Sequence, residues 1–180
     1  YGEGDLRKDW NVAPYYYNIV EETKVNEETQ ETEVVQVTKK IMFSATQIYN
    51  RNPGKWRREY ETGQKARLFN STNFPVIRYS DVLLMKAEAE NEVNGPTDEA
   101  YDAINQVRRR AYGKPVHTAD ATVDLPADLA QTDFLEEVKK ERFRELCFEG
   151  QRKLDLLRWG EYVATMKAFG TEISTTAPSE

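Results

Sequence analysis

The chain has 180 residues, of which 39% are hydrophobic, and this is enough for one domain with a buried core. No apolar run approaches the roughly 20 residues that a helix needs to cross a bilayer. The net charge of −6 argues against nucleic acid or an anionic membrane surface as the main partner, and the single cysteine excludes an internal disulfide framework.

Residues 1–72 are expected to form a loop-rich region around a small antiparallel β-hairpin. Three tyrosines, Tyr15–Tyr17, begin a run of aromatic and β-branched residues, which favours a strand, and a second such run occupies residues 34–43. The segment between them, Glu21–Glu33, is polar and strongly acidic, so it is expected to be the loop at the hairpin tip. We therefore predict a hairpin over residues 15–43.

Residues 50–67 are turn-rich and basic, and they contain the turn signal Pro53–Gly54 and two aromatic residues, Trp56 and Tyr60. The cations of this segment are Arg51, Lys55, Arg57, Arg58, Lys65 and Arg67. Basic residues interleaved with aromatic ones are compatible with single-stranded nucleic acid, whose bases stack on rings. Because the whole chain is acidic, we prefer a loop whose cations meet neighbouring carboxylates.

Two successive helices are predicted after residue 73. Ser80 is a suitable N-cap for the first, the run Asn94–Pro96 predicts its end, and its inward stripe is expected to be Val82, Met85 and Ala89. Thr97 is expected to cap the second, with the inward residues Ala100, Ala103, Ile104 and Val107. Residues 112–131 are a predicted loop with the only histidine, His117, which by itself is weak evidence for a metal ligand or a general base.

The stretch Phe134–Gly160 predicts a helix, a glycine stop and a second short helix. Asp133 and Glu136 resemble a capping box, and Gly150 is well placed to end the first helix. The apolar stripe of the first helix is expected to be Phe134, Leu135, Val138, Phe143, Leu146 and Cys147, and that of the second Leu154, Leu157 and Trp159. A further short helix is expected to complete a helical region over residues 73–170, followed by a frayed polar tail over residues 171–180.

Charged residues recur at helical spacing through the same stretch. Glutamates step by four (Glu141, Glu145, Glu149) beside Arg142 and Arg144, and Arg152, Asp155 and Arg158 step by three. A catalytic carboxylate pair is one interpretation of these acids. Because the spacing is regular and arginines match the acids closely, we prefer a structural network in which guanidinium groups bind carboxylates between packed helices.

This stretch resembles the C-terminal signature of the SusD/RagB family, E-R-x-x-E-L-x-F-E-G-x-R-x-x-D-L-x-R-W. The matching residues are Glu141, Arg142, Glu145, Leu146, Phe148, Glu149, Gly150, Arg152, Asp155, Leu156, Arg158 and Trp159. An upstream segment is similar to the family pattern R-Y-x-D-V-L-L-x-x-A-E-A through Arg78, Tyr79, Asp81, Val82, Leu83, Leu84, Ala87, Glu88 and Ala89. Near the start, Asp5, Arg7 and Trp10 resemble a G-D-x-R element of the family.

The resemblance implies a mainly α, SusD-like fold: a tetratricopeptide-like helix pair plus further C-terminal helices, with a small β-hairpin and long loops near the N-terminus. Family members resemble lipoproteins of several hundred residues, so we expect residues 1–180 to be the C-terminal portion of a longer protein. Its missing N-terminal portion would be a partner of this one and would carry the lipid anchor. The protein would then lie on the extracellular face of the outer membrane.

For function, the resemblance implies non-catalytic capture of an oligosaccharide or polysaccharide for import through a SusC-like TonB-dependent transporter. The alternative is a helical-repeat module that binds a peptide or protein, including a peptide-uptake member of the same family. A glycosidase is a third possibility, because two facing carboxylates suffice, but no spacing singles out such a pair. No catalytic or metal-binding motif occurs in the sequence, so we expect that the protein is not an enzyme. We also expect it to bind no cofactor, metal or nucleic acid.

Aromatic side chains are the natural candidates for a sugar site, since they stack on the apolar faces of sugar rings. Outside the helical signature these are Trp10, Tyr15, Tyr16, Trp56 and Tyr60. Each could instead fill a gap between the hairpin and the helices. Trp159 belongs to the signature and is expected in the core.

Overall fold

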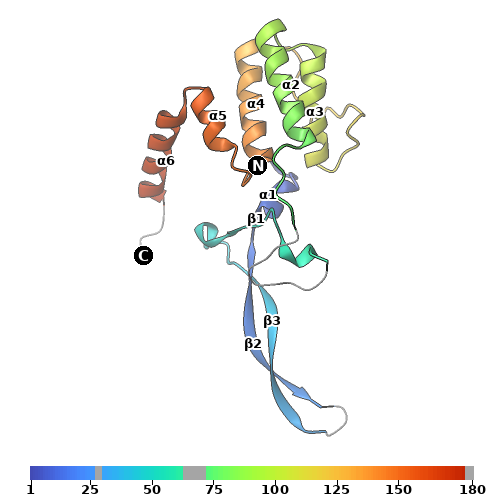
Figure 1. Ribbon diagram of the computed structural model, residues 1–180, viewed down its shortest axis with the longest axis vertical. Helices are drawn as coiled ribbons and strands as arrows, with labels where there is room; N and C mark the ends of the chain where they lie inside the picture. The colour runs from blue at the N-terminus through green and yellow to red at the C-terminus, as the bar shows by residue number, and fades with distance from the viewer. Residues whose placement is uncertain (27–29, 63–71, 177–180) are drawn as a thin grey trace.

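The computed structural model describes residues 1–26, 30–62 and 72–176. Within these ranges the chain is mainly helical, which confirms the expected fold class. One end of the molecule is a bundle, and a long hairpin projects from it in the opposite direction (Figure 1). The bundle consists of α2 (Tyr79–Asn94), α3 (Asp98–Ala111) and α4 (Gln131–Glu145). Between bundle and hairpin lie α1 (Arg7–Asn11), β1 (Val12–Ala13), β4 (Asn52–Pro53) and two 3₁₀ turns, Ile48–Asn50 and Arg58–Tyr60.

The hairpin consists of β2 (Tyr15–Val25) and β3 (Thr32–Met42), paired antiparallel with Tyr15 opposite Met42. The predicted hairpin is confirmed, but the expectation of a loop over Glu21–Glu33 is wrong at both ends, because strand pairing continues to Val25 opposite Thr32. Threonine and valine recur among the acidic residues here and favour a strand. Glu22 also forms an ion pair across the strands with Lys39. The rest of the predicted tip, residues 27–29, lies outside the described ranges.

The core lies where the three bundle helices meet. Its fully buried members include Leu84, Ala87, Ala100, Ile104, Phe134 and Val138. The face predicted for α3 is confirmed, since Ala100, Ala103, Ile104 and Val107 are all buried. The predicted cap is confirmed too, because the Thr97 hydroxyl accepts a hydrogen bond from the backbone N–H of Ala100 at 3.4 Å. The small alanines let α2 and α3 approach closely.

For α2 the predicted start and inward face are wrong. Arg78 is the N-cap residue, and the Ser80 hydroxyl bonds the Arg78 guanidinium instead of capping the helix. The expected stripe of Val82, Met85 and Ala89 is exposed, whereas Leu83, Leu84 and Ala87 face the core. Periodicity failed here because Ser80, Asp81 and Asn91 are polar but buried on the inward face. The predicted end is confirmed by Gly95, whose φ is 82°.

Helix α4 also differs from expectation at both ends. It begins at Gln131 after Ala130, so Asp133 lies inside the first turn and the expected capping box is absent. It ends at Glu145, and a turn that includes Phe148 (φ 63°) separates it from Gly150 (φ 77°). Phe134, Val138 and Leu146 are buried as predicted, but Phe143 is 54% exposed. Charged side chains, Glu141, Arg142 and Glu145, occupy the inward positions near this end of the helix instead.

The last two helices are α5 (Arg152–Arg158), which follows the bundle, and α6 (Tyr162–Thr176), which stands apart from it (Figure 1). The face expected on α5 is wrong, because Leu154 and Leu157 are exposed whereas Leu156 is buried. Helix α6 extends six residues into the predicted tail. Its last turns are compatible with helix because the hydroxyls of Ser174, Thr175 and Thr176 bond backbone carbonyls three or four residues earlier. Residues 177–180 lie outside the described ranges.

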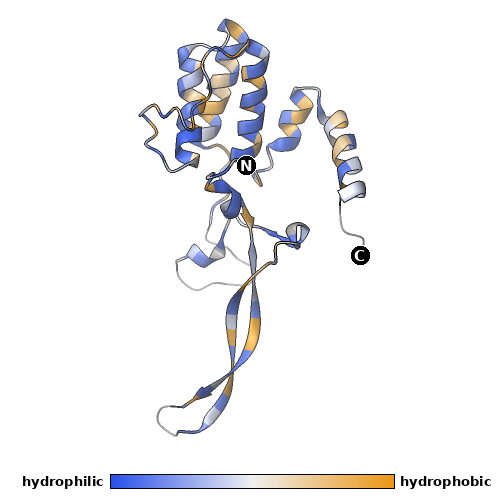
Figure 2. Ribbon diagram, turned by 180° about the vertical axis from the view of Figure 1, so that it is seen from behind, coloured by the Kyte–Doolittle hydropathy of each residue, from blue (hydrophilic) through white to orange (hydrophobic). Residues whose placement is uncertain are grey.

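Helix α6 buries none of its side chains, although Val163, Met166, Phe169 and Ile173 are apolar. Figure 2 shows hydrophobic residues along this separate helix. Across the described ranges, no helix is both long enough and apolar enough to cross a membrane.

Candidate functional site: an aromatic pocket supported by an ion-pair network

The signature residues form a buried ion-pair network that joins the N-terminal segment to the bundle. The Arg7 guanidinium binds Asp5 through Nε (2.9 Å) and Nη2 (2.7 Å). Its Nη1 reaches Glu141 at 2.6 Å and Glu145 at 2.9 Å on α4. The G-D-x-R element therefore docks on the signature helix, although more than 130 residues separate them in the chain.

A second arginine ties the start of α2 to the end of α4. Arg78 binds both carboxylate oxygens of Glu149 at 2.7 Å and also donates to Glu145 Oε1 at 2.6 Å. Lys55 donates to Glu149 and to the backbone carbonyl of Glu145, so the loop after β4 is fixed to the same point. Planar guanidinium groups suit this use because they bind two oxygens in one plane.

A third group joins α2, α4 and α5. Arg142, which is 4% exposed, lies between Asp81 and Asp155, with one 2.9 Å contact to each. Arg158 binds Asp155 at 3.0 Å and pairs with Glu88 on α2. The indole N–H of Trp159 also donates to Glu88, at 2.8 Å. Trp159 thus lies at the junction of the helices and is half-buried.

Arg152 differs from the other signature arginines. Within the described ranges its guanidinium forms no ion pair, and it lies over the Phe143 ring at 4.7 Å and the Trp159 ring at 5.9 Å. The acids that the sequence made candidates for a catalytic pair are bound by guanidinium groups. Although burial opposes ionisation of Glu145, the nearby Arg110, Arg78 and Arg7 lower its pKa to about 2. This network is built to hold elements together, because guanidinium groups already bind its acids.

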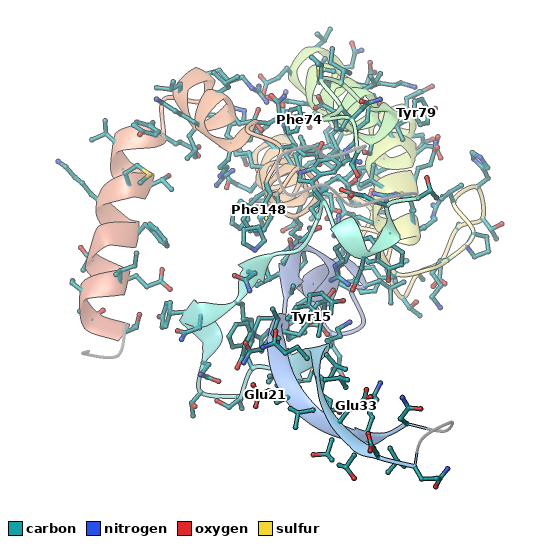
Figure 3. The ribbon with its side chains drawn as sticks, turned by 60° about the horizontal axis from the view of Figure 1, so that its bottom comes forward. Tyr15, Glu21, Glu33, Phe74, Tyr79 and Phe148 are labelled. Carbon is teal, nitrogen blue, oxygen red and sulfur yellow. The ribbon has the colours of Figure 1, made fainter. Side chains whose placement is uncertain are left out.

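An aromatic pocket of about 390 Å³ lies on the hairpin side of this network. Strand β1 pairs with β4 and brings the start of the hairpin against the loop that follows β4. Gly54 permits this approach, because a Cβ there would lie 2.5 Å from the backbone oxygen of Trp10 and 3.0 Å from the Cβ of Ala13. Figure 3 shows Tyr15 at the base of the hairpin, with Glu21 and Glu33 farther along it.

One carboxylate organises the tyrosines of this pocket. Glu59 accepts hydrogen bonds from the hydroxyl groups of Tyr15, at 2.6 Å, and of Tyr17. Alternate residues of a strand share a face, which is why both tyrosines reach the same acid. These two hydrogen bonds lower the pKa of Glu59. Burial, together with Glu59, raises the pKa of Tyr15 to about 12.

Cations cover the Tyr15 ring. Lys40 Nζ lies 3.6 Å from its centroid, and the Arg57 guanidinium lies 5.3 Å from it and 4.4 Å from the Trp10 ring. Tyr15 is accordingly only 8% exposed. Its ring is part of the pocket's support, and stacking with a ligand would fall to the more exposed rings.

Three of the five predicted residues, Tyr15, Tyr16 and Trp56, line the pocket. Trp10 and Tyr60 stack on each other at 5.4 Å beside it. Tyr16 is 37% exposed and packs on Phe43, and Trp56 packs on Phe74. Sequence reasoning missed Tyr17, Arg57 and Glu59. Strand alternation links Tyr17 to Tyr15, but no local pattern pairs Glu59 with a residue more than 40 positions earlier.

The expectation that loop cations meet nearby acids is confirmed for Lys55, which pairs with Glu149, and for Arg57, which lies 3.7 Å from Glu59. Lys65 and Arg67 lie outside the described ranges. In the described part of the chain, no group of three or more His, Cys, Asp or Glu residues could hold a metal ion. His117 lies on an exposed loop beside α3.

Comparisons with known proteins agree with this architecture of helix pair, signature network and aromatic loop region. The chain belongs to the SusD family, whose pattern matches residues 1–180. It is 42% identical over 100 residues to SusD-like protein P25 of Formosa agariphila, and the aligned region covers 56% of this chain and 18% of that protein. It is 27% identical over 168 residues to SusD-like protein P2 of the same organism, and the aligned region covers 88% of this chain and 32% of that protein.

The fold is also similar to a crystal structure of a SusD homologue from Bacteroides thetaiotaomicron. The TM-score is 0.70 at 34% sequence identity, over 94% of this chain and 32% of that one. The chain therefore spans about a third or less of the length of these relatives.

Proposed function

We propose that this chain is part of a nutrient-binding protein that captures oligosaccharides at the cell surface without breaking a bond. The aromatic pocket is the observation that carries the proposal. The exposed rings of Tyr16 and Tyr17 and the half-buried ring of Trp56 offer flat apolar surfaces, while Arg57 and backbone groups supply polar contacts. A sugar-binding site needs both apolar ring surfaces and polar contacts, since sugar rings have apolar faces and hydroxyl edges.

The electrostatics of the pocket support a binding role over hydrolysis. Glycoside hydrolysis requires two carboxyl groups that face the scissile bond. Among the described residues that line the pocket, Glu59 is the only acid. Two tyrosine hydroxyls already bond it and lower its pKa, so it is poorly suited to donate a proton.

Family membership supports the wider setting of this proposal. We propose that the ligand passes to a SusC-like TonB-dependent transporter, and that a lipid anchor holds the whole protein on the extracellular face of the outer membrane.

Tryptophan fluorescence titrated with oligosaccharides tests the proposal. Saturable quenching is expected, and Trp56→Ala or Tyr17→Ala should weaken binding about two- to tenfold, because stacking on each ring contributes about 0.5–1.5 kcal/mol. Tyr79→Ala is the matched control, since Tyr79 is 71% exposed and lies outside the pocket. Sugar binding that survives both pocket variants unchanged would refute this site. Release of sugar products after long incubation would refute the non-catalytic role.

A further inference from the structure

A second cavity of about 390 Å³ lies between the start of α2, the end of α3 and the loop after α3. It shares no residue with the aromatic pocket. Its labelled member Tyr79 lies on the bundle, apart from Tyr15 at the hairpin base (Figure 3). The second cavity is therefore separate from the proposed sugar site.

The inner wall of this cavity is apolar. Leu83 on α2 and Val107 on α3 are almost fully buried, and Val116 adds a third aliphatic side chain from the loop. No charged group comes from these three positions, so the wall favours an aliphatic or aromatic body.

The rim of the cavity is cationic. Its cations are Arg78 and Arg110, and the imidazole of His117 lies beside them on the exposed loop. Arg110 is the most available of the arginines, since its side chain is 49% exposed against 25% for Arg78. Gln106 adds an amide to the same rim.

Among the described residues, Arg110 shares its one counter-ion with two other arginines. In the described part of the chain its one ion-pair partner is Glu145, and the same carboxylate binds Arg7 and Arg78. Arg7 and Arg78 have further acids, Asp5 and Glu149, but Arg110 does not. Among the described residues the Arg110 guanidinium uses only Nη2 for Glu145, so its remaining N–H groups are available to an incoming oxyanion.

We propose that this cavity binds a small amphipathic carboxylate. Its apolar body would lie against Leu83, Val107 and Val116, and its carboxylate would accept hydrogen bonds from Arg110. The apolar wall and the cationic rim each select one half of such a molecule, so neither a short anion nor a neutral amide of the same shape satisfies both.

Isothermal titration of the full chain with hexanoate, hexanamide and acetate tests this proposal. Hexanoate should bind at least tenfold more tightly than either of the others. Arg110→Gln should lower hexanoate affinity about tenfold and leave hexanamide unchanged. Lys140→Gln, an exposed cation on α4 outside the cavity, is the control and should have no effect.

Gln106→Trp provides a test that leaves the ion pairs intact, because the new ring would fill the cavity from its accessible side. It should abolish hexanoate binding, whereas Tyr17→Ala in the aromatic pocket should not alter it. Equal affinity for hexanoate and hexanamide, no heat from hexanoate, or binding that persists in Gln106→Trp would each overturn the proposal. None of these results would bear on sugar binding in the other pocket.

Discussion

At Glu145 one buried carboxylate accepts hydrogen bonds from Arg7 and Arg78 and pairs with Arg110. Replacement by glutamine would leave these guanidinium groups without their shared counter-charge in a site that is 2% exposed. Because breaking a buried ion pair from one side is costly, Glu145→Gln should lower the free energy of unfolding by about 3–5 kcal/mol. Denaturant titration checks this.

Glu136→Gln is the matched control for that variant. Glu136 lies on the same helix, but its side chain is 55% exposed and pairs only with Lys139 among the described residues. The free energy of unfolding should change by less than about 0.5 kcal/mol. Similar losses in both variants would contradict the structural role assigned to the network.

The lowered pKa of Glu145 also predicts that the folded state loses stability in acid. Burial opposes its ionisation, but Arg110, Arg78 and Arg7 still lower its pKa from 4.5 to about 2. Between these values the unfolded chain binds a proton that the folded chain does not, so stability falls as the pH falls. The contribution is fully present above about pH 5 and is lost towards pH 2. Denaturation curves across this window should show the slope, and Glu145→Gln should reduce it; an unchanged slope would contradict the assignment.

Glu59 is the corresponding residue in the aromatic pocket. Burial is the main cause of the raised pKa of Tyr15, and Glu59 is the next. Glu59→Gln removes the second cause, so the pKa of Tyr15 should move from about 12 towards its usual 10. Sugar affinity should fall by about three- to tenfold, because charge-assisted bonds no longer hold both tyrosines. Tyrosine NMR across alkaline pH and sugar titration check the two effects. Glu3→Gln, an exposed change elsewhere, should do neither.

The pairing of strands β1 and β4 positions the pocket. The two backbone segments approach each other closely at Gly54. Gly54→Ala would place a Cβ 2.5 Å from the Trp10 carbonyl oxygen, so the strands must separate. We expect a loss of about 1–3 kcal/mol in unfolding free energy and weaker sugar binding. Gly170→Ala in α6 is the control, because a Cβ there meets nothing within 4 Å and alanine favours helix. Thermal melts compare them, and equal destabilisation would refute the close-approach argument.

The same elements show what the sequence could predict. Turn and cap chemistry is local, so the cap at Thr97 and the stop at Gly95 were predictable, but the caps expected at Ser80 and Asp133 were wrong. The inward faces of the helices were not predictable wherever buried charged residues take the place of apolar ones. Asp81 and Arg142 pair with each other inside the molecule, and hydrophobic periodicity therefore assigned Val82 and Phe143 to the core although both are exposed.

The candidate site follows the same rule. Aromatic composition pointed to Tyr16 and Trp56, which do line one pocket. The acid that orients the pocket, Glu59, comes from a distant segment, and only the β1–β4 pairing brings it to Tyr15. Long-range pairings of this kind have no signature in a single sequence.

At the scale of the whole molecule, α6 exposes a stripe of Val163, Met166 and Phe169 that an isolated helix would not favour. The relatives are longer than this chain, and we predict that in a protein of their length another segment covers the stripe. Phe169→Glu should then destabilise such a longer protein by about 2 kcal/mol or more but change the 180-residue chain little. Equal effects in the two would contradict the prediction.

Isothermal titration of the purified protein is the decisive experiment for the proposed capture of an oligosaccharide. A panel of polysaccharides and their oligosaccharides forms one arm, and peptides form the other. We expect saturable heat from one glycan class, none from peptides, and loss of the signal in Trp56→Ala. Heat from peptides alone, or no heat from any glycan, would contradict the proposed capture.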